Sequence, residues 1–193
     1  LSAFAAGDNN DRQDQYSQEL RIASNGGGKL DYVAGLFLYD ETIDQHLTVS
    51  YGPAATQLLV SQALPALILN GVSKVDTNRY RTTSLAAYGQ ATLHLTDALS
   101  LTGGLRYSHD DKRGHYSAVA AGGLPLLGPL AAFAPLRAAF ASSGAFDVES
   151  KVGNVSGSAN LSYRFSNNVL AYASYSRGNR SGGLNLTQLA SGI

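Results

Sequence analysis

Three short turns divide this chain at nearly equal intervals, and strand-like alternation of apolar and polar residues flanks each of them. The turns lie at residues 24–29, 96–99 and 165–168, about 71 and about 69 residues apart. Two long connections of irregular composition separate them, roughly over residues 41–78 and 109–149. Strands joined alternately by tight turns and long loops are typical of an up-and-down β-barrel with all its short turns at one end. The pattern therefore favours a membrane barrel over a soluble sandwich.

The alternation is clearest after the second turn. Leu101 and Leu105 fall on one face of the predicted strand, and Arg106 falls on the other. Similar apolar rows precede the second and third turns, over residues 85–95 and 155–165. These segments and their partners predict about six strands of roughly 9–16 residues. Since a tilted strand crosses a membrane in about 9–11 residues, the predicted lengths also favour a membrane barrel.

Aromatic side chains lie close to the short turns, as an aromatic girdle at one membrane interface requires. They are Tyr32, Tyr163, Phe165 and Tyr172. A soluble antiparallel sheet would instead need a second layer to cover its apolar face. The remaining sequence is loop rich in glycine and alanine and offers no such layer.

The composition excludes several classes of protein. The 14 basic and 14 acidic residues cancel, so the chain lacks the basic excess of a typical nucleic-acid-binding protein. The absence of cysteine excludes disulfide frameworks and thiolate metal sites. Because methionine is absent even at position 1, we expect the chain to be processed or to be a piece of a longer protein.

One apolar run, Ala118–Leu136, has nearly the length of a membrane-spanning helix. Three prolines and three glycines interrupt it, and they would leave backbone groups without partners in lipid. We therefore expect a loop here, with a short helical patch near Ala131–Ala141.

Several blocks of the chain share an order and a spacing with one known family. They cover residues 17–24 and 30–39, 87–97 and 101–107, and 161–165, 171–178 and 181–185. In this order the blocks resemble barrel strands of the TonB-dependent outer-membrane receptors. The last group, which ends in Ser-Gly-Gly-Leu-Asn, is the most specific of these matches.

The resemblance implies an antiparallel transmembrane barrel of about 22 strands in the outer membrane of a Gram-negative bacterium, closed by an N-terminal plug. It implies a receptor, not an enzyme, that imports a scarce nutrient such as a ferric siderophore. The implied partners are outer-membrane lipid, the nutrient ligand, and the inner-membrane TonB energy-transducing complex, which would act through an N-terminal region missing here. No cofactor or nucleic acid is implied.

We expect residues 1–193 to form a partial barrel domain of about six strands, without the plug and without the C-terminal closing strand. Six strands cannot enclose a passage, so we do not expect transport by this chain alone. Two alternatives remain open at this stage. One is a smaller outer-membrane barrel that acts as a pore or an adhesin, and the other is a soluble β-rich binding domain.

Four charged residues fall on the polar faces of their strands: Glu19, Arg21, Arg106 and Arg164. In a barrel they would line the lumen, where we expect them to pair with one another or with a plug. No catalytic residue is expected, and the sequence predicts no particular ligand-binding residues.

A cluster of two histidines and two acidic residues, at residues 108–111 and His115, resembles a metal-binding group. Neighbouring side chains on a strand point in opposite directions, so His109 and Asp110 would not converge on one ion. We therefore predict a hydrated, charged strand end here and no metal site.

Overall fold

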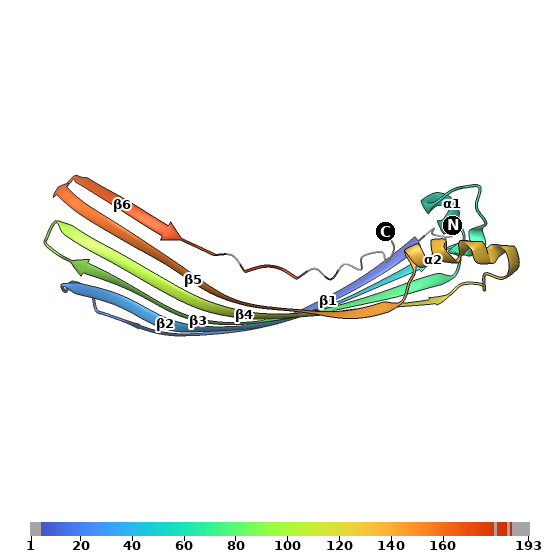
Figure 1. Cartoon of the computed structure of the whole chain (residues 1–193), viewed down its shortest axis with the longest axis horizontal. Helices are drawn as coiled ribbons and strands as arrows, with labels where there is room; N and C mark the ends of the chain where they lie inside the picture. Colours follow the sequence, from blue (N-terminus) through green and yellow to red (C-terminus); the bar gives the residue numbers. More distant parts are fainter. Residues whose placement is uncertain (1–4, 180, 185, 187–193) are drawn as a thin grey trace.

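Six strands form one antiparallel sheet in which each strand pairs with the next along the chain (Figure 1). The computed structural model describes residues 5–179, 181–184 and 186. The strands are β1 Ala5–Ala23, β2 Leu30–Tyr51, β3 Val72–His94, β4 Leu99–Gly122, β5 Gly144–Ser166 and β6 Val169–Arg177. The sheet is long, curved and open, which confirms the predicted partial up-and-down barrel of about six strands.

The three predicted short turns are confirmed, and all of them lie at one end of the sheet. In the first turn, Gly26 and Gly27 have φ angles of +79° and +80°, which residues with a Cβ rarely adopt. In the second turn, the Thr96 hydroxyl accepts hydrogen bonds from the backbone N–H groups of Ala98 and Leu99, at 3.2 and 2.9 Å.

The predicted strand lengths of 9–16 residues are wrong for five of the six strands. Strands β1 to β5 contain 19 to 24 residues, and only β6, with 9, falls in the expected range. The long connections shrink accordingly, to residues 52–71 and 123–143. Away from the short turns, the face that carried the apolar rows becomes polar, whereas Ile43, Phe146 and Val148 lie on the opposite face. The apolar pattern of the turn end therefore stops while the backbone pairing continues.

The two faces of the sheet differ in chemistry. The described residues after β6 lie above the concave side (Figure 1). Leu186, one of these residues, packs against Tyr116 of β4. Tyr116 and Arg106 both occupy even-numbered positions of β4, and the pairing of this strand has no register shift, so their side chains lie on the same face. Since Tyr116 lies on the concave face, the polar face that contains Arg106 is the concave one. The apolar rows therefore lie on the convex face.

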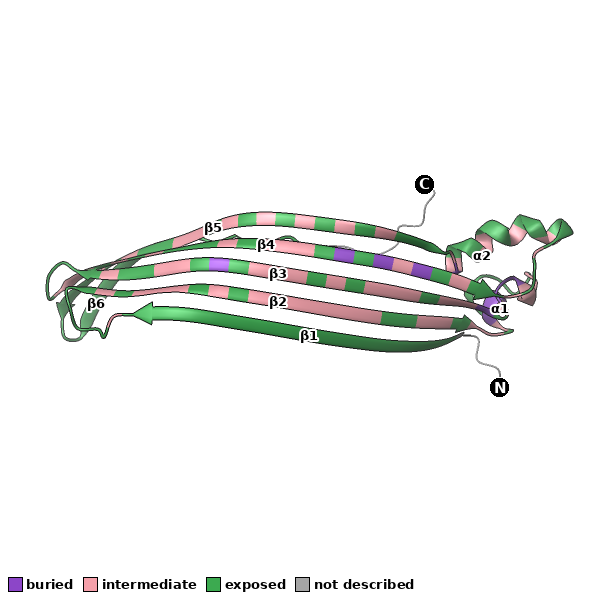
Figure 2. Cartoon of the chain, turned by 90° about the horizontal axis from the view of Figure 1, so that it is seen from below, coloured by how far each residue is buried: buried purple, intermediate pink, exposed green. Residues whose placement is uncertain are grey.

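Pairing across the sheet aligns these apolar residues into rows. From the turn end, the rows are Leu30/Leu93/Leu101/Leu161, Tyr32/Ala91/Gly103/Ala159, Ala34/Gly89/Leu105/Gly157, Leu36/Ala87/Tyr107/Val155 and Leu38/Leu85/His109/Gly153. Their large side chains are exposed, Leu105 by 69% and Leu36 by 53%. Figure 2 shows this convex side, on which exposed and half-buried residues predominate. An apolar surface of this kind is the expected contact with lipid.

The predicted aromatic girdle needs one correction. Tyr32 and Tyr163 lie on the convex face near the turns, and the rings of Tyr163 and Phe165 meet edge-on with centroids 4.7 Å apart. Tyr172, however, pairs with Ser162 and therefore lies on the concave face. Tyr175, which pairs with Ala159, takes a convex position in the same row as Tyr32.

The two long loops pack against each other at the far end of the sheet. The first contains α1 Ala55–Leu59 and η1 Ala66–Ile68, and the second contains η2 Gly128–Phe133 and α2 Ala134–Phe140. The predicted helical patch near residues 131–141 is thus confirmed, whereas residues 118–122 belong to β4 and not to a loop. In the described part of the chain no helix has the length and apolar character needed to cross a membrane.

A small apolar core holds the loop pair together. Its buried residues come from the first loop, and aromatic residues of the second loop pack against them. Arg137 of α2 links the loops, since its guanidinium donates to the backbone oxygens of Ile68, Leu67 and Leu124 at 2.6, 2.9 and 2.9 Å. We call this assembly of residues 52–71 and 123–143 the loop pair.

Candidate functional site on the concave face

The concave face carries all four charged residues that the sequence singled out. Glu19 and Arg21 lie on it in β1, Arg106 in β4 and Arg164 in β5. Glu19 accepts a hydrogen bond from the Tyr88 hydroxyl, and Arg106 lies over the Phe37 ring with its guanidinium carbon 5.6 Å from the ring centre. The contacts described for these two residues therefore involve aromatic partners. That the four residues line a closed lumen stays a prediction.

A glycine makes the contact between Tyr88 and Glu19 possible. Tyr88 lies in β3 and Glu19 in β1, so the tyrosine side chain must cross β2 to reach the carboxylate. It crosses at Gly35, where a Cβ would lie 2.6 Å from the tyrosine oxygen. The Tyr88 side chain therefore packs directly against the backbone of β2 where it contacts Glu19.

A second polar cluster lies nearer the loop pair, again on the concave face. The Lys74 ammonium is 2.9 Å from Asp76, and the Tyr116 hydroxyl donates to the same carboxylate oxygen at 2.6 Å. The ammonium also donates to the Tyr116 oxygen at 3.3 Å. Lys74 and Asp76 are two residues apart in β3, and alternate residues of a strand share a face.

The Lys74–Asp76 pair is sheltered from solvent, with side chains only 17% and 14% exposed. Burial by itself lowers the pKa of Lys74, but its bonds to Asp76 and Tyr116 outweigh this effect and leave that pKa above its ordinary value. Burial, together with the bond to Asp76, raises the pKa of Tyr116. At neutral pH the cluster thus presents a charged ammonium beside a protonated phenol.

An aromatic surface adjoins this cluster. The rings of Tyr116 and Phe146 stack with centroids 5.1 Å apart and an angle of 29° between their planes. Tyr80 and Val148 extend the surface, and Leu186 packs against it. Gly114 leaves the space for that leucine, because a Cβ there would lie 2.7 Å from a Leu186 methyl carbon. We call Tyr80, Tyr116, Phe146 and Lys74 the aromatic–lysine site.

The sequence does not predict this site, because most of its residues lie in segments whose composition predicts loops. The available signal was the alternation that puts Lys74 and Asp76 on one face, with Tyr80 at the same parity four residues further. Without an apolar opposite face, that alternation was not distinguishable from loop sequence.

The histidine and aspartate cluster of β4 is divided between the two faces. Asp110 accepts a hydrogen bond from Ser84 at 2.5 Å on the concave face, whereas His115 contacts Asp147 at 2.7 Å on the convex face. The cluster also lies within β4, not at the strand end that the sequence suggested. Among the described residues, no group of three or more histidine or acidic side chains could hold a metal ion.

Comparison with known families identifies the barrel. The family described as TonB dependent receptor-like, beta-barrel, matches residues 2–192. The chain belongs to the TonB-dependent receptor family. This confirms the resemblance found in the sequence. It is a family of outer-membrane transport receptors, not of enzymes.

Two curated relatives are the pesticin receptors of Yersinia enterocolitica and Yersinia pestis. Each is 33% identical to this chain over 106 residues, which are 54% of the chain and 13% of the relative. The chain therefore spans only a small part of the length of these relatives.

A solved structure shows the same architecture. The crystal structure of the ferric yersiniabactin uptake receptor FyuA from Yersinia pestis matches 90% of this chain with a TM-score of 0.63. The chain covers 22% of that receptor at 22% sequence identity, so the likeness concerns the fold.

Proposed function

We propose that this chain is a segment of the barrel wall of a receptor that takes up a ferric siderophore or a similar iron chelate. Membership of the TonB-dependent receptor family supports the uptake role, and the names of the relatives support the ligand class. In this proposal the convex face contacts outer-membrane lipid and the concave face lines the lumen. Uptake would draw on the TonB energy-transducing complex through parts of the receptor outside this chain.

The observation that carries the proposal is the aromatic–lysine site. It combines the half-buried rings of Tyr80 and Phe146, which lie beside the buried Tyr116, with the Lys74 ammonium, which is paired with Asp76. Small-molecule sites in proteins typically combine an aromatic lining with a few fixed polar groups in this way. Such a site suits a compact chelate whose ligand carries aromatic or apolar rings.

The position of the site is consistent with capture from outside the cell. It lies on the concave face close to the loop pair, at the end of the sheet remote from the short turns. Short turns of outer-membrane barrels are periplasmic and long loops extracellular. A ligand that enters past the loop pair would therefore meet this site early in its passage.

The test is made in the full-length receptor that contains this chain. We expect Tyr116→Ala combined with Lys74→Gln to weaken binding of a ferric siderophore by about tenfold or more, because the variant loses the ring that supports Phe146 and loses a charged hydrogen-bond donor. Binding is measured by titration of purified receptor, and uptake is measured with radiolabelled iron in iron-starved cells.

Ser117→Ala is the matched control, since Ser117 follows Tyr116 in β4 but lies on the convex face. It should bind and transport as the wild type does. Cells without the energy-transducing complex should bind the chelate yet fail to import it. Unchanged affinity of the double variant for every ferric siderophore that the wild-type receptor binds would refute the proposed site.

A further inference from the structure

A shallow hollow lies on the concave face at the level of Arg106. It has a volume of about 490 Å³, and residues of β1, β3, β4, β5 and β6 line it. Along β4, Arg106 and the Tyr116 of the aromatic–lysine site are separated by roughly 33 Å of strand. A small ligand does not reach from one to the other, so the hollow is a separate place on the same face.

A glycine opens this hollow. Gly104 lies on the concave face and pairs with Gln90 of β3 and Ser158 of β5. A Cβ at this position would lie 3.5 Å from the Ser158 hydroxyl oxygen and 3.6 Å from the Gln90 side chain. A longer side chain would therefore occupy the space that the hollow now leaves open.

Small uncharged groups make up much of the polar lining. Ser156, Ser158 and Ser176 supply hydroxyls, and Gln90 supplies an amide. Each of these groups can donate a hydrogen bond to an oxygen atom without adding charge. The lining thus offers several neutral donors around the glycine.

The lining also carries a surplus of positive charge. Two arginines, Arg106 and Arg177, belong to it, and the described lining residues include one carboxylate, that of Glu19. This carboxylate already accepts a hydrogen bond from the Tyr88 hydroxyl. The hollow therefore favours an anionic group over a cationic one.

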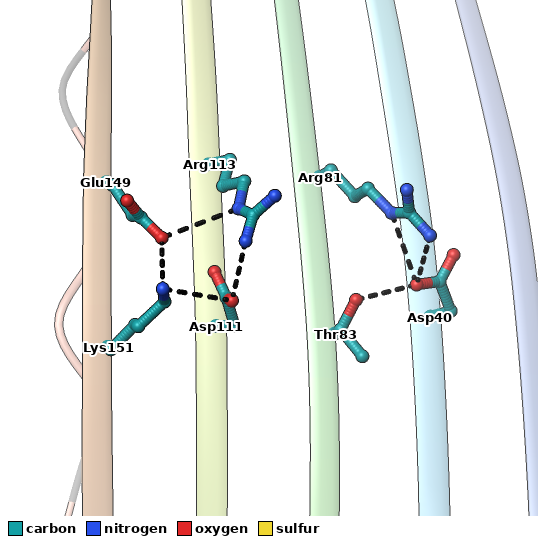
Figure 3. A network of polar contacts seen from close by, with 7 residues as sticks. All are labelled: Asp40, Arg81, Thr83, Asp111, Arg113, Glu149 and Lys151. Atoms are coloured by element: carbon teal, nitrogen blue, oxygen red, sulfur yellow. Dashed lines mark hydrogen bonds and ion pairs between the residues drawn. The ribbon is translucent and has the colours of Figure 1, made fainter.

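Arg106 differs from the arginines further out along the strands (Figure 3). Figure 3 shows Arg81 beside Asp40, at 3.3 Å, and Arg113 beside Asp111, at 3.2 Å. Each of these guanidinium groups is thus neutralised by a carboxylate of the wall itself. In the outer part of the sheet, the wall supplies its own counterions.

No such counterion accompanies the arginines of the hollow. Within the part of the chain that the structure describes, neither Arg106 nor Arg177 forms an ion pair with a carboxylate. The contact described for Arg106 is with the ring of Phe37, whose centre lies 5.6 Å from the guanidinium carbon. A ring supports the guanidinium from one side and leaves its N–H donors for an oxygen ligand.

We propose that this hollow binds a carboxylate group of the ferric chelate, as the chelate moves from the aromatic–lysine site towards the short turns. The inference rests on the proposed function, which places the concave face in the lumen. A guanidinium binds a carboxylate through two parallel hydrogen bonds, and the serine hydroxyls can donate to the same oxygens. One charged fork among neutral donors binds a passing ligand weakly enough to release it.

The first experiment measures carboxylate binding at the hollow in the purified full-length receptor. This chain contains no cysteine, so Ser158→Cys introduces a single thiol into it. Any reactive cysteine elsewhere in the receptor is replaced beforehand. The rate of thiol labelling is measured with a sulfonate-bearing methanethiosulfonate, with and without citrate. We expect an excess of citrate to slow labelling about fivefold, and Arg106→Gln to remove most of this protection.

Asn160→Cys is the matched control, because Asn160 lies on the same face of β5 but does not line the hollow. Citrate should leave its labelling rate unchanged. The proposal is overturned if citrate fails to protect Ser158→Cys, if protection persists in Arg106→Gln, or if sodium chloride at equal ionic strength protects as well. An unreactive Ser158→Cys thiol would also overturn it, since another part of the receptor would then fill the hollow.

The second experiment tests the role of the hollow in passage. Gly104→Leu fills it, whereas Gly103→Leu places the same side chain on the convex face, where nothing lies within 4 Å of a Cβ. We expect Gly104→Leu to bind the ferric siderophore of the titration above with unchanged affinity and to import its radiolabelled iron several-fold more slowly. Gly103→Leu should bind and import as the wild type does. Resistance to unfolding by heat in detergent checks that both variants are folded, and normal import by Gly104→Leu would refute the role in passage.

The labelling experiment separates this inference from the proposed function. Citrate protection in a receptor that binds no ferric siderophore would leave the carboxylate site in place and refute only the uptake role. Absence of protection in a receptor that binds a ferric siderophore at the aromatic–lysine site would refute only the hollow.

Discussion

At the scale of single residues, glycines leave space on the surface of the sheet for side chains from other segments. Gly35 gives Tyr88 its path across β2 to Glu19, and Gly114 gives Leu186 its place over β4. In both cases a neighbouring side chain occupies the space that a Cβ would need. These glycines serve packing, because neither of them has a positive φ angle.

We predict that Gly35→Ala lowers the free energy of unfolding by about 1–3 kcal/mol. The new methyl group would displace the Tyr88 ring, which could then no longer donate its hydrogen bond to Glu19. The measurement is the urea midpoint of refolded full-length receptor in lipid vesicles.

Gly103→Ala is the control for this prediction, since nothing lies within 4 Å of a Cβ at that position. Its midpoint should match that of the wild type. In a receptor that already carries Tyr88→Ala, adding Gly35→Ala should lower the free energy of unfolding much less than it does in the wild type. An equal decrease with and without Tyr88 would contradict the packing explanation.

At the scale of elements, Arg137 joins the two long loops into one unit. Its three hydrogen bonds reach backbone oxygens of both loops, and the apolar core lies beside them. The two helical segments of each loop are short, so they depend on these contacts more than on their own helix stability.

We predict that Arg137→Ala makes both loops more sensitive to protease on intact cells, by about tenfold in cleavage rate. Each lost bond leaves a carbonyl oxygen without its charged donor, at about 1–3 kcal/mol apiece if the loops do not rearrange. Limited proteolysis followed by mass spectrometry locates the cleavage sites. Arg113→Ala, in the barrel wall, should leave the loops as resistant as in the wild type, and faster cleavage in only one loop would contradict the joint role of Arg137.

The elements also show which parts of this fold the sequence could predict. The turns and the adjoining halves of the strands were predictable, because one face there is apolar and the other polar in strict alternation. The outer halves were not, since polar residues such as Asp40 and Arg81 take over the convex face, while the charged Lys74 and Asp76 interrupt the concave face. The aromatic–lysine site was missed for the same reason, as it depends on pairing between distant strands.

At the scale of the whole molecule, the apolar rows define a band on the convex face. The band runs from the short turns to the row of Leu38 and Leu85, and the strands then continue beyond it. In the proposed membrane placement, the strands are long because they contain a membrane-crossing part and an outer part. Only the first part is apolar on its convex side.

We predict that Leu105→Arg reduces the amount of assembled receptor in the outer membrane several-fold. Leu105 lies near the middle of the band, where an arginine that faces lipid costs about 2–4 kcal/mol. Assembly is measured by the heat-dependent shift of the receptor on gels of membrane fractions. Ser158→Arg, one strand away on the concave face, should assemble normally, and normal assembly of Leu105→Arg would show that the convex face does not contact lipid.

The unbroken pairing of the long strands has a mechanical consequence. From β1 to β5 the register runs without a shift, and the irregularity among the described strands lies between β5 and β6, beside the third turn. Bulges are the points at which a sheet bends locally, so a wall without them behaves as a stiff plate along the length of its strands. A force applied along the strands at the loop end would act as shear and would be spread over many backbone hydrogen bonds at once. The wall should therefore hold its shape while the loops above it move.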